Sequence, residues 1–327
     1  MIWENILEGI PKLGTAAAGI AVFFAILLIV FFVLGRIRGR LSNPVAMLAF
    51  LGPAAILLML GLVVPTFQTV YKSLFNASGK KFIGLQNYGW IFTTESNQQV
   101  LINTALWIVI APLFSTVIGL VLALLLDRRR RESIPKSLIF MPMAISFVGA
   151  SIIWGLVYAY RDPAQEQVGL LSQVVLWLGI EPPNWILLQP WNNFLLMVIM
   201  IWIQTGFAMV VLSAAIKAIP GDVVEAATLD GATGWRLFSR VTVPMIRTTL
   251  IVVVTTIMIA TLKIFDIVRV MTNGNFGTQI VANEMYSQAF VQFDVGRGSA
   301  LAVILFLGVI PLVSYNIIQL RRERAIR

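Results

Sequence analysis

The side chains that could do chemistry in this sequence are few and lie in two places. The 327 residues include no His and no Cys, which excludes imidazole catalysis, imidazole metal ligands, disulfides and thiolate metal sites. Acidic residues interrupt apolar sequence at Glu225 and Asp230, inside a polar interval at 217–247, and at Asp266, three residues after Lys263. We therefore predict no catalytic residue and no metal site, and the functional interpretation depends on these two places.

The composition around these residues predicts an all-α integral membrane protein. Apolar residues make up 58% of the chain, 12% of residues are charged, and the mean hydropathy is +0.88, unlike a soluble domain. A helix of roughly 20 residues crosses the hydrocarbon of a bilayer. Suitable runs are Leu13–Leu34, within Leu41–Tyr71, within Val100–Leu126, Ser137–Tyr160, within Trp191–Ile216, Thr248–Val268 and Gly298–Leu320.

These runs predict about seven transmembrane helices. An eighth apolar stretch, Val168–Ile180, is too short to span and predicts an interfacial or re-entrant helix. The basic residues near the first run, Arg36 to Arg40, follow it, so we expect a retained helix and not a cleaved signal peptide.

The distribution of Lys and Arg predicts the orientation of these helices. With the N-terminus outside, the cytoplasmic segments hold 16 of the 24 basic residues, and the C-terminus is cytoplasmic as well. Those segments are 35–44, 127–136, 217–247 and 321–327. Basic clusters beside membrane helices anchor topology, so the net charge of +9 does not indicate a nucleic-acid partner.

The polar interval 217–247 predicts two short helices on the cytoplasmic surface. Pro220-Gly221-Asp222 is a turn with an acid suited to the start of a helix at Val223–Leu229. Gly231 ends that helix, and a second one at Trp235–Val241 precedes Pro244, which opens the next membrane helix. From these residues alone, an ordinary structured loop explains the interval as well as a docking site does.

The motif Glu225-Ala-Ala-Thr-Leu-Asp-Gly-Ala232, with Phe238 and Pro244 behind it, resembles the coupling loop of binding-protein-dependent ABC importer permeases. The likeness covers about residues 45–325 and is greatest for the carbohydrate-uptake family, which includes maltose and glycerol-phosphate permeases. Other landmarks of that family are Phe82–Tyr88, Asn103-Thr104, Leu138–Pro142, Ile219-Pro220, Phe265-Asp266, Met271–Gly274 and Phe293–Gly296. Within the family, Met141–Ala150 and the extra first helix are similar to permeases for α-glucosides such as maltose or trehalose.

The resemblance implies a six-helix permease core at 45–327, preceded at 1–44 by an added transmembrane helix and a basic linker. It also implies that the chain forms half of a translocation pore in a bacterial or archaeal cytoplasmic membrane, as a heterodimer with a second permease. Two ATP-binding subunits and an extracytoplasmic sugar-binding protein would complete the importer. The chain would not be an enzyme: ATP and Mg are bound by the partner ATPase, and the only Gly-Lys, at Gly79, lacks the Ser or Thr of a phosphate loop.

The resemblance assigns roles inside the coupling loop. The helix from Glu225 to Leu229 would sit in a cleft of the ATPase, where two small alanines permit close approach. Gly231 would make the turn, and Asp230 would cap the helix or make a polar contact. The coupling residues are Glu225, Ala226, Ala227, Leu229, Asp230, Gly231, Phe238 and Pro244.

The same alignment implies a sugar pathway along the fifth and sixth spans. Its positions are Ile203, Gln204 and Phe207 on one helix and Ile257, Ala260, Thr261 and Ile264 on the other, where the spacing is that of one helix face. Maltose-type relatives carry more polar residues on the sixth span. Either Gln204, Phe207 and Thr261 hold the sugar, or the companion permease does, or these residues only pack helices.

Lys263 and Asp266 allow two interpretations. A Lys in a membrane helix is costly and is either paired or functional. The i, i+3 spacing favours an ion pair on one helix, and an outer gate or sugar contact is the alternative.

Other classes of protein remain as alternatives to a sugar permease. A permease for another solute such as glycerol-phosphate fits the same landmarks. A seven-helix receptor fits the number of spans but gives no reason for the Glu225-Ala-Ala motif. A membrane enzyme would need a carboxylate-rich face, and few acids lie inside the spans.

Overall fold

The computed structural model describes residues 42–127, 132–162 and 164–326, with scattered positions between 14 and 32. Most of the first predicted span, and the basic residues at 36–40 and 128–131, therefore lie outside the described residues. Contacts between Cα atoms divide the chain into two compact units, residues 1–68 and 69–327.

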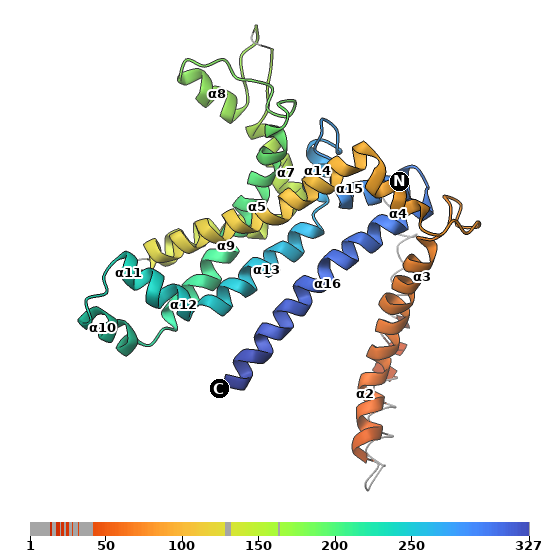
Figure 1. Ribbon diagram of the computed structural model, residues 1–327, viewed down its shortest axis with the longest axis horizontal. Coiled ribbons are helices and arrows are strands. Elements are labelled where there is room, and N and C mark those ends of the chain that lie inside the picture. Colours follow the sequence, from red (N-terminus) through yellow and green to blue (C-terminus); the bar gives the residue numbers. More distant parts are fainter. Residues whose placement is uncertain are drawn as a thin grey trace. The chain divides into compact units, whose positions relative to one another are not determined.

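Regular structure in the described part of the chain is helical, apart from one isolated antiparallel bridge between Phe75 and Phe82 (Figure 1). The α-helices are α2 (Ser42–Leu58), α3 (Val64–Lys72), α4 (Gln86–Thr93), α5 (Glu95–Leu126), α6 (Ser133–Phe140), α7 (Phe147–Val157), α8 (Leu170–Trp177), α9 (Trp191–Lys217), α10 (Gly221–Leu229), α11 (Trp235–Leu237), α12 (Val243–Met245), α13 (Arg247–Leu262), α14 (Asp266–Met271), α15 (Val281–Tyr286) and α16 (Val295–Ile326). π-Helical turns at Met59–Val63 and Phe238–Thr242 join consecutive helices, a third at Ser287–Val291 continues α15, and a 3₁₀ turn at Met141–Ala144 follows α6.

The centre of the second unit is the contact between α5 and α9. Small residues bring the two backbones together: a Cβ on Gly119 would lie 2.6 Å from the Cβ of Ala208 and 2.8 Å from the amide nitrogen of Met209. On α9, Gly206 permits an equally close approach of α6, because a Cβ at this position would lie 2.5 Å from the carbonyl oxygen of Ile139. Glycine at such crossings is typical of helices that pack without a hydrophobic driving force.

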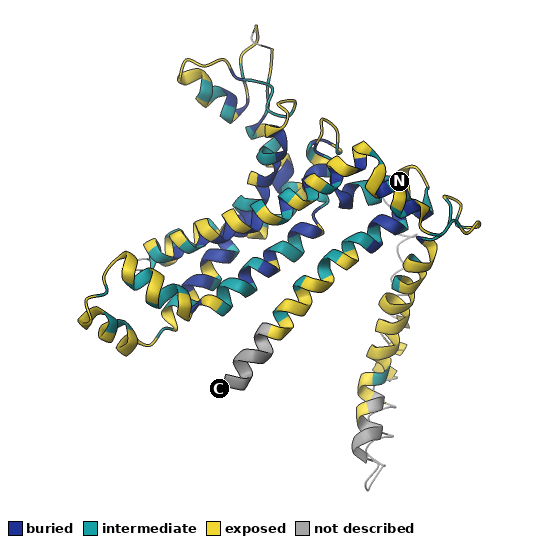
Figure 2. Ribbon diagram, viewed as in Figure 1, coloured by how far each residue is buried: buried dark blue, intermediate teal, exposed yellow. Residues whose placement is uncertain are grey.

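α13 completes this core by packing against α5, α9 and α16. Figure 2 shows the buried residues concentrated on α9 and on the neighbouring faces of α5 and α13. α16 is buried mainly in its first turns, and its later apolar residues, such as Phe306 and Leu307, are exposed. An exposed apolar helix of this length fits a lipid or protein contact.

Four described helical stretches are long and apolar enough to cross a membrane: Phe50–Lys72, Glu95–Leu126, Trp191–Lys217 and Val295–Ile318. Two bent helix pairs raise the number to six if each pair is one span. The predicted helical class is thereby confirmed for the described residues, and four to six candidate spans agree with a multi-pass membrane protein. The count of seven and the orientation of the termini stay predictions.

The predicted continuous span Ser137–Tyr160 is wrong in its geometry. α6 and α7 meet at 104° across the 3₁₀ turn that contains Pro142. Ile145 is extended, and Ser146 caps α7 by accepting a hydrogen bond from the amide of Gly149 at 3.0 Å. Proline and a capping serine four residues apart therefore end one helix and start another in a new direction.

The predicted short helix at Val168–Ile180 is present as α8, with eight residues. It rests on the end of α7 through Ser172, whose hydroxyl donates to the carbonyl oxygen of Ala159 at 2.9 Å and accepts from Trp185 Nε1 at 2.9 Å. Trp177 and Leu178 at its end are largely exposed. α8 is too short to span a bilayer.

Candidate functional site

The coupling-loop motif forms a capped helix, α10. Asp222 lies in its first turn, where a carboxylate meets the positive end of the helix dipole. At the other end, the amides of Asp230 and Ala232 donate to the carbonyl oxygens of Ala226 and Ala227, at 3.0 and 2.9 Å. Gly231 has φ +82°, the left-handed conformation that ends a helix and favours glycine.

The chain then makes a second helical segment that leads into the membrane. After Gly234, with φ +48°, α11, a π-helical turn and α12 form one run from Trp235 to Met245. Pro244 lies in the first turn of α12, and the run meets α13 at 70°. The predicted pair of short helices is therefore present, and the second extends four residues beyond the predicted Val241.

This helix pair exposes apolar side chains. No residue of α10 is buried, Leu229 is 88% exposed, and Trp235 is 75% exposed with its ring 5.1 Å from that of Phe238. Glu225 and Ala226 are also exposed, and most of α10 is coloured as exposed in Figure 2. Apolar side chains grouped on a polar, structured projection mark an interaction surface.

A cluster of charges ties α5, α6 and α9 together at the end of α9 that leads into α10. Lys136 forms ion pairs with Asp127 and with Glu132, the latter at 3.0 Å, and donates a hydrogen bond to the hydroxyl of Ser213 at 2.6 Å. Ser213 in turn donates to Asp127 at 2.5 Å, and Lys217, the last residue of α9, pairs with Glu132. Hydrogen bonds from Lys217 and Lys136 hold the pKa of Glu132 below its usual range.

The positions predicted for the sugar pathway lie mostly within the packed helices. Ile203 and Ile264 belong to one buried apolar cluster, Ile257 belongs to a second, and the hydroxyl of Thr261 donates to the carbonyl oxygen of Ile257 at 2.8 Å. The remaining positions, Phe207 and Ala260, are half-buried, and Gln204 is 9% exposed. Gln204 is a buried polar residue, and its amide forms no hydrogen bond within the described part of the chain.

The prediction of one continuous helix through Lys263 and Asp266 is wrong. α13 ends at Leu262, and α14 begins at Asp266, so the two residues are not on one helix face. Lys263 is exposed, and among the described residues it forms no ion pair with Asp266. Ile264 likewise lies beyond the helix face that Ile257, Ala260 and Thr261 share.

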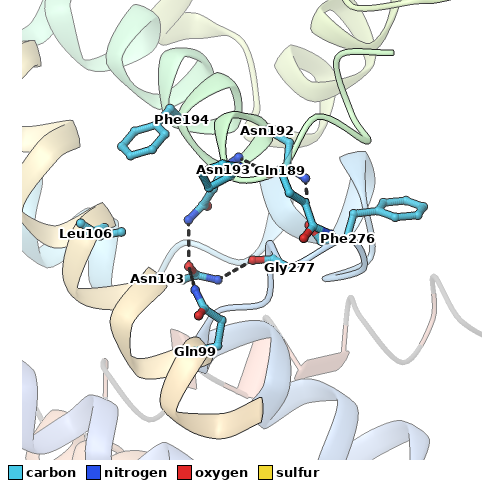
Figure 3. A pocket seen from close by; sticks show the side chains of 10 residues that line it. Gln99, Asn103, Leu106, Gln189, Asn192, Asn193, Phe194, Phe276 and Gly277 are labelled. Atoms are coloured by element: carbon cyan, nitrogen blue, oxygen red, sulfur yellow. Dashed lines mark hydrogen bonds between the residues drawn. The ribbon is translucent and has the colours of Figure 1, made fainter. Parts of the chain in front are cut away.

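Sequence analysis missed a network of buried amides at the opposite end of α9. Asn103 on α5 donates to the carbonyl oxygens of Gly277 and Gln279, at 2.7 and 2.9 Å, and accepts from Asn193 at 3.1 Å (Figure 3). Trp107 donates to Asn193 at 2.8 Å. The network ties α5 and α9 to the 272–280 segment, and the signal for it was the recurrence of Asn and Gln toward the N-terminal ends of the apolar helices α5 and α9.

The same segment is held in an unusual backbone conformation. Phe276 has φ +58°, which costs a non-glycine residue free energy. Its carbonyl oxygen accepts a hydrogen bond from buried Asn192 at 2.8 Å. Gly274 has φ +80°, the left-handed conformation that favours glycine, and a Cβ there would lie 2.0 Å from the side-chain oxygen of Gln279, which would have to move. The loop is therefore specified by its contacts.

Comparison with known proteins agrees with this architecture. Residues 115–327 match the family described as the binding-protein-dependent transport system inner membrane component. The chain is 49% identical over 285 residues, 87% of its own length and 85% of the relative's, to the alpha-glucoside transport system permease protein AglF of Rhizobium meliloti. It is 48% identical over 278 residues, 85% of its length and all of the relative's, to the osmoprotective compounds uptake permease protein GgtC of Synechocystis.

A solved structure shows the same fold. It is a chain of a bacterial ABC transporter involved in the import of the acidic polysaccharide alginate, with a TM-score of 0.74 and 19% identity, covering 86% of the present chain and 97% of the other. The protein is therefore an inner membrane component of the binding-protein-dependent transport family, a permease subunit and not an enzyme. The family resemblance inferred from the Glu225-Ala-Ala motif is confirmed.

Proposed function

We propose that this chain forms half of the translocation pore of an ATP-driven importer of α-glucosides and receives the ATPase stroke through α10. The observation that carries the coupling role is the exposed apolar surface of Leu229 and Trp235 on a capped helix pair that the chain's own core leaves uncovered. A helix with a buried face would be part of the fold. One with an exposed apolar end fits a cleft in a second protein.

The topology that supports this role has seven spans, with the N-terminus outside and the C-terminus and residues 217–247 in the cytoplasm. Residues 1–44 are the added helix and its linker, and 45–327 are the importer domain. The partners of this chain are a second permease, two ATP-binding subunits and an extracytoplasmic sugar-binding protein. The importer lies in a bacterial or archaeal cytoplasmic membrane. The basic residues of the cytoplasmic segments support this orientation.

The solute passes between this chain and its companion permease. On this side we assign the contact to the free amide of Gln204, with Phe207 and Ala260 as half-buried neighbours. Lys263, exposed where α13 ends, is placed to act as an outer gate or sugar contact, because it has no ion pair with Asp266 to maintain. The relative named as an alpha-glucoside transport permease supports an α-glucoside as cargo, and within that class we propose maltose or trehalose.

A second candidate cargo is an osmoprotective compound, because the Synechocystis relative is matched over its whole length. Uptake of radiolabelled maltose and trehalose by cells that express the full importer separates the two candidates. Uptake at ordinary osmolarity supports α-glucoside import. If the cells take up neither sugar, and the importer instead restores their growth at high osmolarity, α-glucoside import is overturned in favour of uptake of an osmoprotective compound.

The coupling role is tested by Glu225→Lys and Gly231→Val. The first reverses a charge on the docking helix, and the second places a β-branched side chain at a positive φ. We expect both to abolish uptake and sugar-stimulated ATPase activity while the chain reaches normal membrane abundance. Glu181→Lys, an equal reversal at an exposed acid distant in sequence from α10, is the matched control. Unchanged uptake in the Glu225 and Gly231 variants would refute the assignment.

A further inference from the structure

Two adjoining cavities flank Asn103 at the end of α9 remote from α10. One, of about 290 Å³, lies between α5, the start of α9 and the 276–277 turn (Figure 3). The other, of about 400 Å³, extends from Asn103 toward α4 and α15. They share Gln99, Asn103 and Gly277, and each is in the size range of small-molecule sites.

The amide of Asn103 between the cavities is fully hydrogen-bonded, but some side-chain oxygens that line the cavities have no hydrogen-bond donor among the described residues. Gln288 is 3% exposed; its amide nitrogen donates to Glu284 at 2.7 Å, and its buried oxygen has no partner within the described part of the chain. Gln99 donates to Asn103 at 3.0 Å, and no hydrogen bond to the described residues uses its oxygen. A buried acceptor without a donor is unfavourable, so the second cavity favours a ligand that donates hydrogen bonds.

The chemistry of the lining selects the kind of ligand. Among the residues that the structure describes, no Lys or Arg lines either cavity, which argues against a phosphate or another anion. The carboxylate of Glu284 already accepts from Gln279 and Gln288, at 2.6 and 2.7 Å, so it does not require a cation. Amides both donate to and accept from hydroxyl groups, and Leu106, Phe194 and Trp90 add apolar walls.

We propose that these cavities form a loading site for a neutral polyhydroxylated solute, separate from the mid-membrane positions on α9 and α13. The proposal rests on the proposed function as a sugar importer, since it places the site at the outer mouth of the permease. Gln99, Gln189 and Gln288 are its hydrogen-bonding residues. The network around Asn103 positions them by fixing α5, α9 and the 272–280 segment.

Because the chain has no Cys, an introduced thiol is unique in it and reports access to the site. We would introduce Gln99→Cys and Gln189→Cys, each exposed and lining a cavity, into the full importer in nanodiscs without binding protein. The rate of maleimide labelling of this chain is measured with maltose, trehalose, sucrose or lactose. Gln98→Cys is the control, because Gln98 is the exposed neighbour that lines neither cavity.

We expect at least one of these sugars to slow labelling at both cavity positions several-fold and to leave Gln98→Cys unchanged. In uptake assays, Gln99→Ala removes one neutral hydrogen bond, so half-saturation should rise roughly two- to tenfold. Equal labelling rates with and without every sugar, in a preparation that transports sugar, overturn the loading site and leave the proposed function standing. Failure of the unmodified importer to take up any sugar overturns the proposed function instead, and sugar protection at both cavity positions would still support the site.

Discussion

At the scale of single residues, glycine decides how closely the helices approach. Gly119 and Gly206 lie where backbones meet, and a Cβ at either position would fall within 3 Å of atoms on another helix. Gly155, on α7, has no atom within 4 Å of the position that its Cβ would take. The same residue type is therefore required at two of these positions and replaceable at the third.

We predict that Gly119→Ala destabilises the folded chain by about 1–3 kcal/mol, the usual cost of overpacking a core. The clash involves the backbone nitrogen of Met209, which cannot move like a flexible side chain. Gly155→Ala should change stability by no more than about 1 kcal/mol, and in the stabilising direction, since alanine favours helix. Unfolding of the purified chain in detergent measures both variants. Equal stability of the two would contradict this account of the α5–α9 contact.

At the scale of elements, the ion cluster of Asp127, Glu132, Lys136 and Lys217 joins the ends of α5, α6 and α9. Lys217 is the last residue of α9, so its pair with Glu132 anchors the point from which α10 departs. The cluster adds ion pairs to the apolar packing of Ile216 and Ile219 against the core, at the junction of α9 and α10.

The lowered pKa of Glu132 predicts a pH-dependent contribution to stability. Because the folded-state pKa lies below the ordinary value of 4.5, the stabilisation is complete above that value and is lost as pH falls through the folded-state pKa. Glu132→Gln should remove this part of the pH dependence and lower stability at neutral pH. Thermal unfolding between about pH 7 and pH 3 measures it, with the exposed Glu181→Gln as control. If Glu132→Gln and the unmodified chain lose stability in parallel as pH falls, the ion pairs of Glu132 with Lys136 and Lys217 contribute nothing to stability.

At the scale of the whole molecule, the orientation of the chain in the membrane can be measured with introduced cysteines, as in the labelling experiment above. Ser239→Cys, exposed in the coupling segment, should react with an impermeant maleimide only from the cytoplasmic side, and Gln98→Cys only from outside. Seven spans require Glu4→Cys to react from outside. If Glu4→Cys reacts from the cytoplasm while the other two behave as expected, the number of spans is even.

Much of this architecture could be predicted because its signals are local. Apolar runs predict membrane helices, and Pro220, Gly231 and Pro244 mark where the short helices of the coupling loop begin and end. The family followed from the Glu225-Ala-Ala motif for the same reason. Lys263 and Asp266 show the limit: their spacing allowed an ion pair on a helix, but α13 ends at Leu262, before both residues.

The sequence by itself determined the membrane class, the family and the local form of the coupling loop, since hydropathy, glycine and proline act over a few residues. Only the tertiary structure decided that α6 and α7 meet at 104°, and that Ile203, Ile257 and Ile264 are buried. It also decided that amides from α5, α9 and the 272–280 segment enclose a polar cavity. Those outcomes depend on contacts between residues as much as 176 positions apart, which no local pattern records.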